Sequence, residues 1–250
     1  MTGRRFWKTP SPPRDDMNLY WQEEKDDPGR YEVPDDIVDI HFKVRCKSLP
    51  LDHNQALSDA IHTALPWVAD EEDVAIPAIH VAESGNGWMR PDDPENEVLY
   101  LSRRTRMSLR VPSHRIDDTR KLAGRTLDIA GNPLEVGEPS EHKLSKLTTI
   151  FCRYLASPQA EDEPAFLKSV YEQLQALGVK PRKMLTGKLR RIRSHEGDID
   201  TRSLLLAELD IEESILLQQK GLGPARKLGC GIFLPHKGIE AVRKIQDEKT

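Results

Sequence analysis

Strand and helix patterns follow the same order twice along this chain, and this repetition restricts the fold more than any other feature. Residues 37–45 alternate between apolar and polar side chains and are rich in β-branched residues, which predicts a strand. Later patterns predict a helix beginning at Asp52, strands near 76–81 and within 98–111, a short helix after Ser113 and a strand at 126–129. This β-α-β-β-α-β order is that of the ferredoxin-like arrangement.

The second half of the chain repeats the order more loosely. Its patterns predict a strand near 147–154, a helix from Pro164 to Gly178, a basic segment at 189–194, a strand at 203–209, a helix after Asp210 and a strand at 232–234. Asp52 with Gln55, and Asp210 with Glu213, have the spacing of a capping box at a helix start. We therefore predict an α+β fold of two tandem ferredoxin-like (RRM-like, βαββαβ) domains.

The predicted boundaries give an N-terminal domain at 37–140 and a C-terminal domain at 141–238, with a C-terminal tail at 239–250. The N-terminal extension, residues 1–36, holds five prolines and five aromatic residues and shows no sustained period. It is either a disordered tail or an arm that becomes ordered on a partner.

Composition predicts a soluble protein of a reducing compartment, which we take to be the cytoplasm. No apolar run approaches the ~20 residues needed to cross a bilayer, and the N-terminus lacks the apolar core of a secretory signal. The three cysteines, Cys46, Cys152 and Cys230, lie far apart and have no metal-type spacing. We therefore expect no disulfide framework, no metal site, no cofactor and no membrane partner.

The net charge of −4 conceals a strong separation of charge along the chain. Residues 70–98 hold nine acidic residues and one basic residue, whereas residues 180–195 hold no acidic residue. A basic run is often a solvated face, but two separated runs in one chain favour nucleic-acid binding. The first run supplies Lys183, Lys188, Arg190, Arg191 and Arg193, and the second supplies Arg103, Arg104, Arg106 and Arg110.

Residues 221–233 join the last predicted helix to the last predicted strand and combine four glycines with two adjacent cations. These are Gly221, Gly223, Gly229 and Gly231, with Arg226 and Lys227. Such a loop suits the cradling of a phosphodiester backbone by its N–H groups, or it is a plain turn between helix and strand. It is not a P-loop, because no Lys-Ser or Lys-Thr follows a glycine. It is not a dinucleotide fingerprint either, because it follows a helix and opens a strand.

Three local matches, in this order, resemble the CRISPR-associated repeat-processing endoribonucleases, the Cas6 family, and most closely its MYXAN-type branch. The first is Ile37-Val-Asp-Ile-His-Phe42 followed by Leu49-Pro-Leu-Asp-His53, and the second is Ala123-Gly-Arg-Thr-Leu-Asp128. The third is the run from Glu212 to Pro235, whose glycines look like the family's glycine-rich loop. The resemblance covers about 37–236.

The resemblance implies paired ferredoxin-like folds that bind the repeat hairpin of a precursor guide RNA and cut at its base without a metal. The ribose 2′-hydroxyl attacks the adjacent phosphate, which leaves a cyclic phosphate and a 5′-hydroxyl. The implied partners are the repeat RNA and the other subunits of an effector complex. The alternatives are a catalytically inactive subunit that holds the 3′ hairpin of the guide RNA, and an RNA-binding double domain unrelated to CRISPR.

His53 matches the family's histidine near the start of the first helix, and histidine titrates near neutrality. We predict it as the general acid or base, although it is alternatively a structural part of the helix start. Some relatives use a Tyr or Lys in the first helix as well, but no Tyr or Lys occurs between 48 and 99 here. Arg45, Lys47 or Arg226 is the candidate to neutralise charge on the phosphate.

Overall fold

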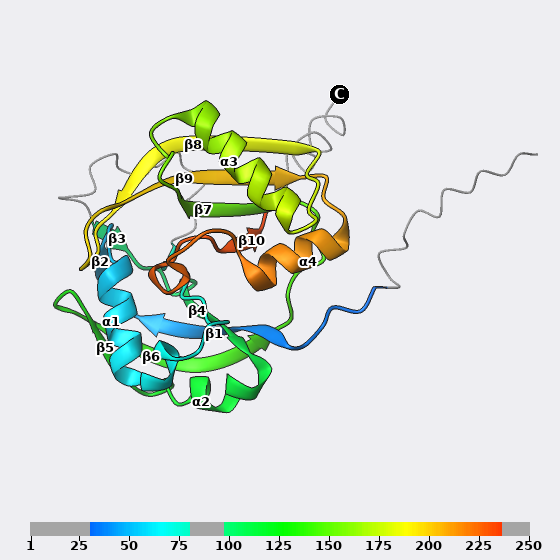
Figure 1. The fold of residues 1–250 in the computed structure, drawn as a ribbon. Coiled ribbons are helices and arrows are strands. Elements are labelled where there is room, and N and C mark those ends of the chain that lie inside the picture. Colours follow the sequence, from blue (N-terminus) through cyan, green and yellow to red (C-terminus); the bar gives the residue numbers. More distant parts are fainter. Residues whose placement is uncertain (1–30, 81–97, 237–250) are drawn as a thin grey trace, which may run out of the picture. The chain divides into compact units, whose positions relative to one another are not determined.

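The computed structural model describes residues 31–80 and 98–236, which form two four-stranded antiparallel sheets with helices packed on them (Figure 1). A further two-stranded sheet joins β2 (Ser48–Pro50) to β3 (Val98–Tyr100). The fold is mixed α+β, as predicted. Most of the predicted N-terminal extension, residues 81–97 of the acidic segment 70–98 and the C-terminal tail lie outside the described residues.

The first sheet has the order β4-β1-β6-β5, with every neighbouring pair antiparallel. Its strands are β1 (Ile37–Arg45), β4 (Arg106–Pro112), β5 (Thr126–Ile129) and β6 (Asn132–His142). Its helical elements are α1 (Asn54–Ala64), α2 (Ile116–Arg120) and the 3₁₀ turns Pro66–Ala69 and Ser113–Arg115. Alternate residues of β1, including Ile40 and Phe42, are fully buried in one core with Leu57 and Ile61 of α1.

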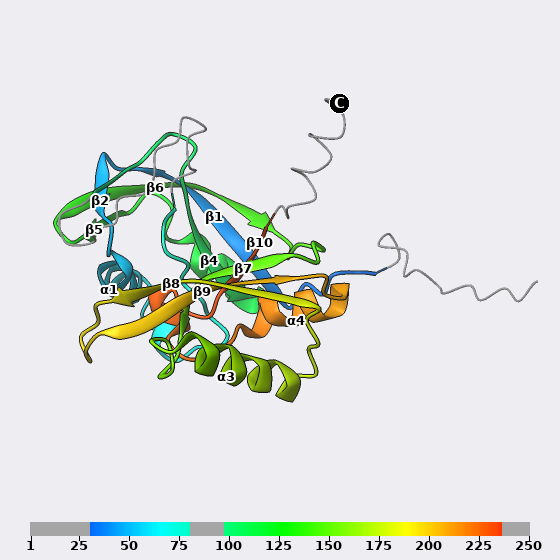
Figure 2. The same ribbon diagram turned by 90° about the horizontal axis from the view of Figure 1, so that it is seen from above.

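The second sheet has the order β10-β7-β9-β8, again antiparallel throughout. Its strands are β7 (Ile150–Ala156), β8 (Lys183–Ile192), β9 (Ile199–Ala207) and β10 (Phe233–Pro235). Its helical elements are α3 (Glu163–Ala176), α4 (Ile211–Lys220) and the 3₁₀ turn Arg226–Leu228. In Figure 2, α3 lies against one face of this sheet. Phe166 of α3 and Leu217 of α4 bury the core side of β7 and β9.

The predicted strand near 76–81 is wrong for its described part. Only Ala75 bridges to β4, at Arg110, and residues 76–80 form no strand. The two strands predicted within 98–111 exist as β3 and β4, but they pair with β2 and β1 and not with each other. In the first sheet, the second neighbour of β1 is β6. The predicted strand at 126–129 is β5, which pairs with β6 and forms the edge of the sheet.

The two sheets are tied together through Arg110, which sequence alternation places among the surface cations. Arg110 is 0% exposed, and it makes a bidentate ion pair with Asp39, with Nε–Oδ1 and Nη2–Oδ2 distances of 2.7 and 2.8 Å. Its Nη1 donates to the carbonyl oxygens of Gln218 and Phe233, at 2.5 and 3.0 Å, at the end of α4 and in β10. The expectation that Arg110 contacts RNA is therefore wrong, because its guanidinium is used inside the protein.

The three thiols are free. Burial raises the pKa of Cys152 and of Cys230 to about 12, with the neighbouring Cys230 a lesser cause for Cys152. No helix among the described residues has the length and apolar character needed to cross a membrane.

Candidate nucleic-acid interface

The glycine-rich loop, residues 221–231, connects the second sheet to the first. Asn54 at the start of α1 donates from Nδ2 to the Leu228 carbonyl at 2.7 Å, and the Ile76 N–H donates to the Arg226 carbonyl at 3.2 Å. Gly229 has φ +83°, which favours glycine, and a Cβ there would meet Asn54 Nδ2 at 2.7 Å and displace this amide. The loop is therefore more than a plain turn between helix and strand.

Most N–H groups of this loop are already used inside the protein. Those of Gly221 and Gly231 donate to the carbonyls of Leu217 and Tyr154, at 2.9 and 2.7 Å, and that of Gly229 donates to Arg226 at 3.1 Å. These glycines are buried, whereas Gly223 is exposed. The expectation that the loop cradles phosphate with the N–H groups of Gly221, Gly229 and Gly231 is wrong, because each N–H bonds a carbonyl.

The two cations of the loop differ in their surroundings. Arg226 is half-buried and donates from Nη2 to the Gln219 carbonyl at 2.8 Å, while its buried Nε has no partner among the described atoms. Burial, and next the charge of Arg110, lower the pKa of the Arg226 guanidinium. Lys227 donates to the Ala69 carbonyl at 2.7 Å. Both side chains thus tie the loop to neighbouring backbone.

The basic hairpin, which we define as β8, β9 and the turn between them, carries fewer uncompensated charges than its sequence indicates. Arg191 pairs with Asp200 at 2.7 Å, and Asp198 and Glu161 lie 3.9 Å from its guanidinium. The hydrogen bond to Asp200 raises the pKa of Arg191. Lys183, another residue of the basic run, forms an ion pair with Glu208 of the turn after β9. Lys188 and Arg193 are exposed and Arg190 is half-buried.

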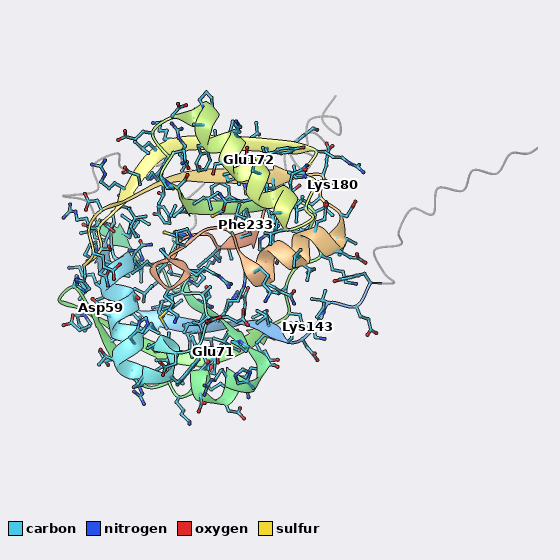
Figure 3. The ribbon with its side chains drawn as sticks, in the orientation of Figure 1. Asp59, Glu71, Lys143, Glu172, Lys180 and Phe233 are labelled. Atoms are coloured by element: carbon cyan, nitrogen blue, oxygen red, sulfur yellow. The ribbon has the colours of Figure 1, made fainter. Side chains whose placement is uncertain are left out.

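The tip of the basic hairpin is held by the residue before the N-cap of α1 and by the first two turns of this helix. The Arg193 N–H donates to Asp52 Oδ2 at 3.1 Å, and the His195 N–H donates to Gln55 Oε1 at 3.2 Å. His195 Nε2 also lies 2.9 Å from an oxygen of Asp59, which Figure 3 labels on α1. We refer to Asp52, Gln55 and Asp59 as the hairpin clasp.

The hairpin clasp corrects the predicted capping box at Asp52 and Gln55. The N-cap of α1 is His53, with no side-chain capping bond, because both predicted capping side chains bind the hairpin backbone instead. The box at Asp210 and Glu213 is confirmed. Asp59 could not be assigned a role from sequence, because a carboxylate on an exposed helix face has no local signal for a partner 136 positions away.

His53 is 1% exposed. Its Nδ1 lies 2.9 Å from the Pro50 carbonyl, and its Nε2 accepts from the Ile79 N–H at 3.0 Å. Because Nε2 accepts a hydrogen bond from Ile79, it carries no proton, and the ring proton of the neutral histidine lies on Nδ1. These contacts therefore select one neutral tautomer. In this arrangement, the ring must release one of the two bonds before that nitrogen can exchange a proton with RNA.

The other predicted site residues lie near the end of β1. Arg45 and Lys47 are exposed, and Arg45 has an ion pair with Glu135 at 3.6 Å. Arg45 lines a hollow of about 760 Å³ together with Lys43 and the exposed Arg103. Neither Arg45 nor Lys47 is among the described contacts of His53, so the structure does not bring these predicted catalytic residues together.

Comparisons with known proteins agree with this architecture. The family model described as Cas6 CRISPR matches residues 38–238 and so spans both sheets. The chain belongs to the Cas6 family. The CRISPR-associated endonuclease Cas6 of Myxococcus xanthus strain DK1622 is 32% identical over 198 residues, which are 79% of this chain and 81% of that protein. As a member of the Cas6 family, the chain is a CRISPR endoribonuclease.

Solved structures of Cas6 proteins share the fold at low sequence identity. A Cas6-related protein from Pyrococcus furiosus superposes with a TM-score of 0.54 at 14% identity, over 80% of this chain and 99% of that chain. A structure titled CRISPR associated protein Cas6 gives a TM-score of 0.52 at 12% identity, over 80% and 100% of the two chains. These likenesses concern the fold alone.

Proposed function

We propose that this chain binds the repeat hairpin of a precursor CRISPR RNA and cleaves it without a metal by attack of the 2′-hydroxyl, and that it stays with the product as a subunit of an effector complex. The observation that carries the proposal is the family match from residue 38 to residue 238. The basic hairpin clasped to α1 supports it, because its tip at Arg193 and His195 is bonded to the start of the helix whose N-cap is His53.

We also propose that each sheet belongs to one ferredoxin-like domain, with the division near residue 140. In the second sheet, the first strand in the sequence (β7) lies between the last and the third, which is the ferredoxin-like order. The first sheet fits the same order if the Ala75 bridge stands for the second strand and β6 for the fourth. The domains would then be residues 37–140 and 141–238.

In the proposed reaction the 2′-oxygen bonds to the adjacent phosphorus as the bond to the 5′-oxygen breaks. A base must take the 2′-proton, an acid must protonate the departing 5′-oxygen, and cations must balance the charge that grows on phosphate. We propose His53 for a proton transfer, with Arg45, Lys47 or Arg226 balancing the phosphate. His53 would first exchange its Ile79 N–H bond for one to the RNA.

Cleavage of the cognate repeat RNA in EDTA tests the proposal. The His53→Gln variant is its sharpest arm, because a glutamine amide oxygen can still accept from the Ile79 N–H but cannot transfer protons. We expect the wild type to cut, and the variant to keep its melting temperature and RNA affinity while the single-turnover rate falls by about 10²-fold or more. Unchanged cleavage would remove His53 from the chemistry. Binding without any cutting by the wild type would favour the inactive hairpin-holding subunit.

The exposed Lys188 and the half-buried Arg190 of the basic hairpin predict that RNA binding weakens as salt rises. Replacing Lys188 and Arg190 together with glutamine should lower the slope of log K against log salt by roughly 1.4 to 1.8, because each phosphate contact contributes about 0.7 to 0.9. Fluorescence anisotropy with the repeat hairpin from 50 to 300 mM salt measures this slope. Lys121→Gln, which removes an exposed cation paired with Asp118 beside α2, is the matched control. Equal slopes for the wild type, the double variant and the control would show that the RNA does not bind at the basic hairpin.

A further inference from the structure

One face of the second sheet carries a row of apolar side chains that crosses all four strands. Leu234 of β10 lies opposite Phe151 of β7, which lies opposite Leu205 of β9, which in turn lies opposite Leu185 of β8. Residues directly opposite one another in a sheet point to the same face. We call these four residues the apolar row.

The apolar row points away from the core of its own domain. The neighbouring positions Ile150, Cys152, Leu204 and Leu206 point to the other face and are fully buried under α3 and α4. In contrast, Leu185 is 56% exposed, and Phe151, Leu205 and Leu234 are only half-buried. Helices on one face and an accessible apolar row on the other mark the second face as a binding surface.

The chemistry around the ring of Phe151 suits nucleobases. The Arg153 guanidinium lies 5.8 Å from the ring centroid, and the ring of the exposed His236 lies 5.8 Å away at 51°. Aromatic rings and guanidinium planes are the groups on which unpaired bases stack. Four-stranded sheets of this topology present aromatic residues to RNA on this same face in RNA-recognition motifs.

The charges bordering the apolar row fit an anionic chain. The next positions on the same face are Arg153, Ser203 and Gly187 on one side, and Lys183 with Ala207 on the other. Within the described strands, these border positions include no carboxylate. Arg153 is the cation beside the ring, because Lys183 is paired with Glu208 of the turn after β9. An acidic protein segment would pair with Arg153 but would bring no planar base for the ring of Phe151, whereas a nucleotide brings both a base and a phosphate.

We propose that the apolar row, with Arg153, binds unpaired nucleotides of the repeat RNA by stacking at Phe151. This inference rests on the proposed function and adds a second contact to it: the basic hairpin holds the paired part of the repeat, and the open face of the second sheet holds a single-stranded part. Stacking tolerates any base, so this contact adds affinity and direction without reading sequence.

The test measures binding of a short oligoribonucleotide that carries the unpaired segment of the cognate repeat and one 2-aminopurine. Phe151→Ala should weaken binding by roughly 5- to 150-fold, the effect of losing one stacked base, and should abolish the fluorescence quenching. Phe151→Trp should keep both within about twofold. Tyr171→Ala, which removes an aromatic residue that is 45% exposed on α3, is the matched control and should leave both unchanged.

Two further measurements separate the possible failures. Phe151→Leu keeps an apolar side chain without a ring, and wild-type affinity in this variant would overturn stacking in favour of a general apolar contact. Melting temperatures of all variants exclude unfolding as the cause of a loss. If the wild type cleaves the full repeat but Phe151→Ala binds the oligonucleotide normally, this inference fails and the proposed function stands. If the wild type neither binds nor cleaves repeat RNA, both fail.

Discussion

Replacing Arg110 with methionine should lower the free energy of unfolding by about 3 to 5 kcal/mol, the range expected when one member of a buried ion pair is removed. The variant leaves the carboxylate of Asp39, 13% exposed, without its cation, and it leaves two carbonyls from α4 and β10 without a donor. Methionine fills much of the volume, so the loss reports the polar contacts more than a cavity. Urea unfolding monitored by circular dichroism measures it.

Arg106→Met is the control for Arg110→Met, since Arg106 lies four residues earlier, in β4 as well. Arg106 is exposed and, among the described residues, donates to the nearby carbonyls of Arg103 and Thr105, so its loss should change stability by about 0.5 kcal/mol or less. Because Arg110 contacts both sheets, its loss should also expose the second sheet to proteolysis early in unfolding. Equal stability of the two variants would show that the two sheets do not depend on Arg110 for their association.

The second sheet follows from sequence because its signals are local. The capping box of Asp210 and Glu213 forms within four residues, and Gly178 at φ +78° follows α3 as predicted. The first sheet is less predictable, because its completion depends on partners far away. β6 joins β1 through pairs such as Asp39 with His142, which no local pattern indicates.

In the candidate site too, local features could be predicted from sequence and contacts with distant residues could not. Sequence places the basic hairpin and the glycine-rich loop on the correct elements, but it does not show what each side chain binds. Asp52 and Gln55 have the spacing of a capping box, yet in the fold their side chains accept hydrogen bonds from the backbone of the hairpin instead. Arg110 follows the alternation of a surface strand and is buried only because the second sheet covers that face.

The second large effect is expected at Gly231. This residue has φ +65°, and a Cβ added there would overlap the carbonyl oxygen of Leu222, whose N–H in turn donates to the Gly231 carbonyl at 3.0 Å. Alanine therefore meets two costs at once: about 1 to 2 kcal/mol for the left-handed backbone, and about 1 to 3 kcal/mol for forcing an atom into packed backbone. We expect Gly231→Ala to lower the free energy of unfolding by about 2 to 5 kcal/mol.

Gly178→Ala separates the two costs at Gly231. Gly178 has a similar φ, +78°, but a Cβ there would meet nothing within 4 Å, so alanine at 178 meets only the backbone strain. The difference in urea-unfolding free energy between the two variants is then the contribution of close packing between Leu222 and Gly231. A larger loss of stability in Gly231→Ala than in Gly178→Ala would show that close packing against Leu222 holds this part of the glycine-rich loop in its shape. Equal stability of the two variants, with RNA affinity lost in Gly231→Ala alone, would contradict the packing role. The glycine would then be needed for a change in the loop backbone on RNA binding.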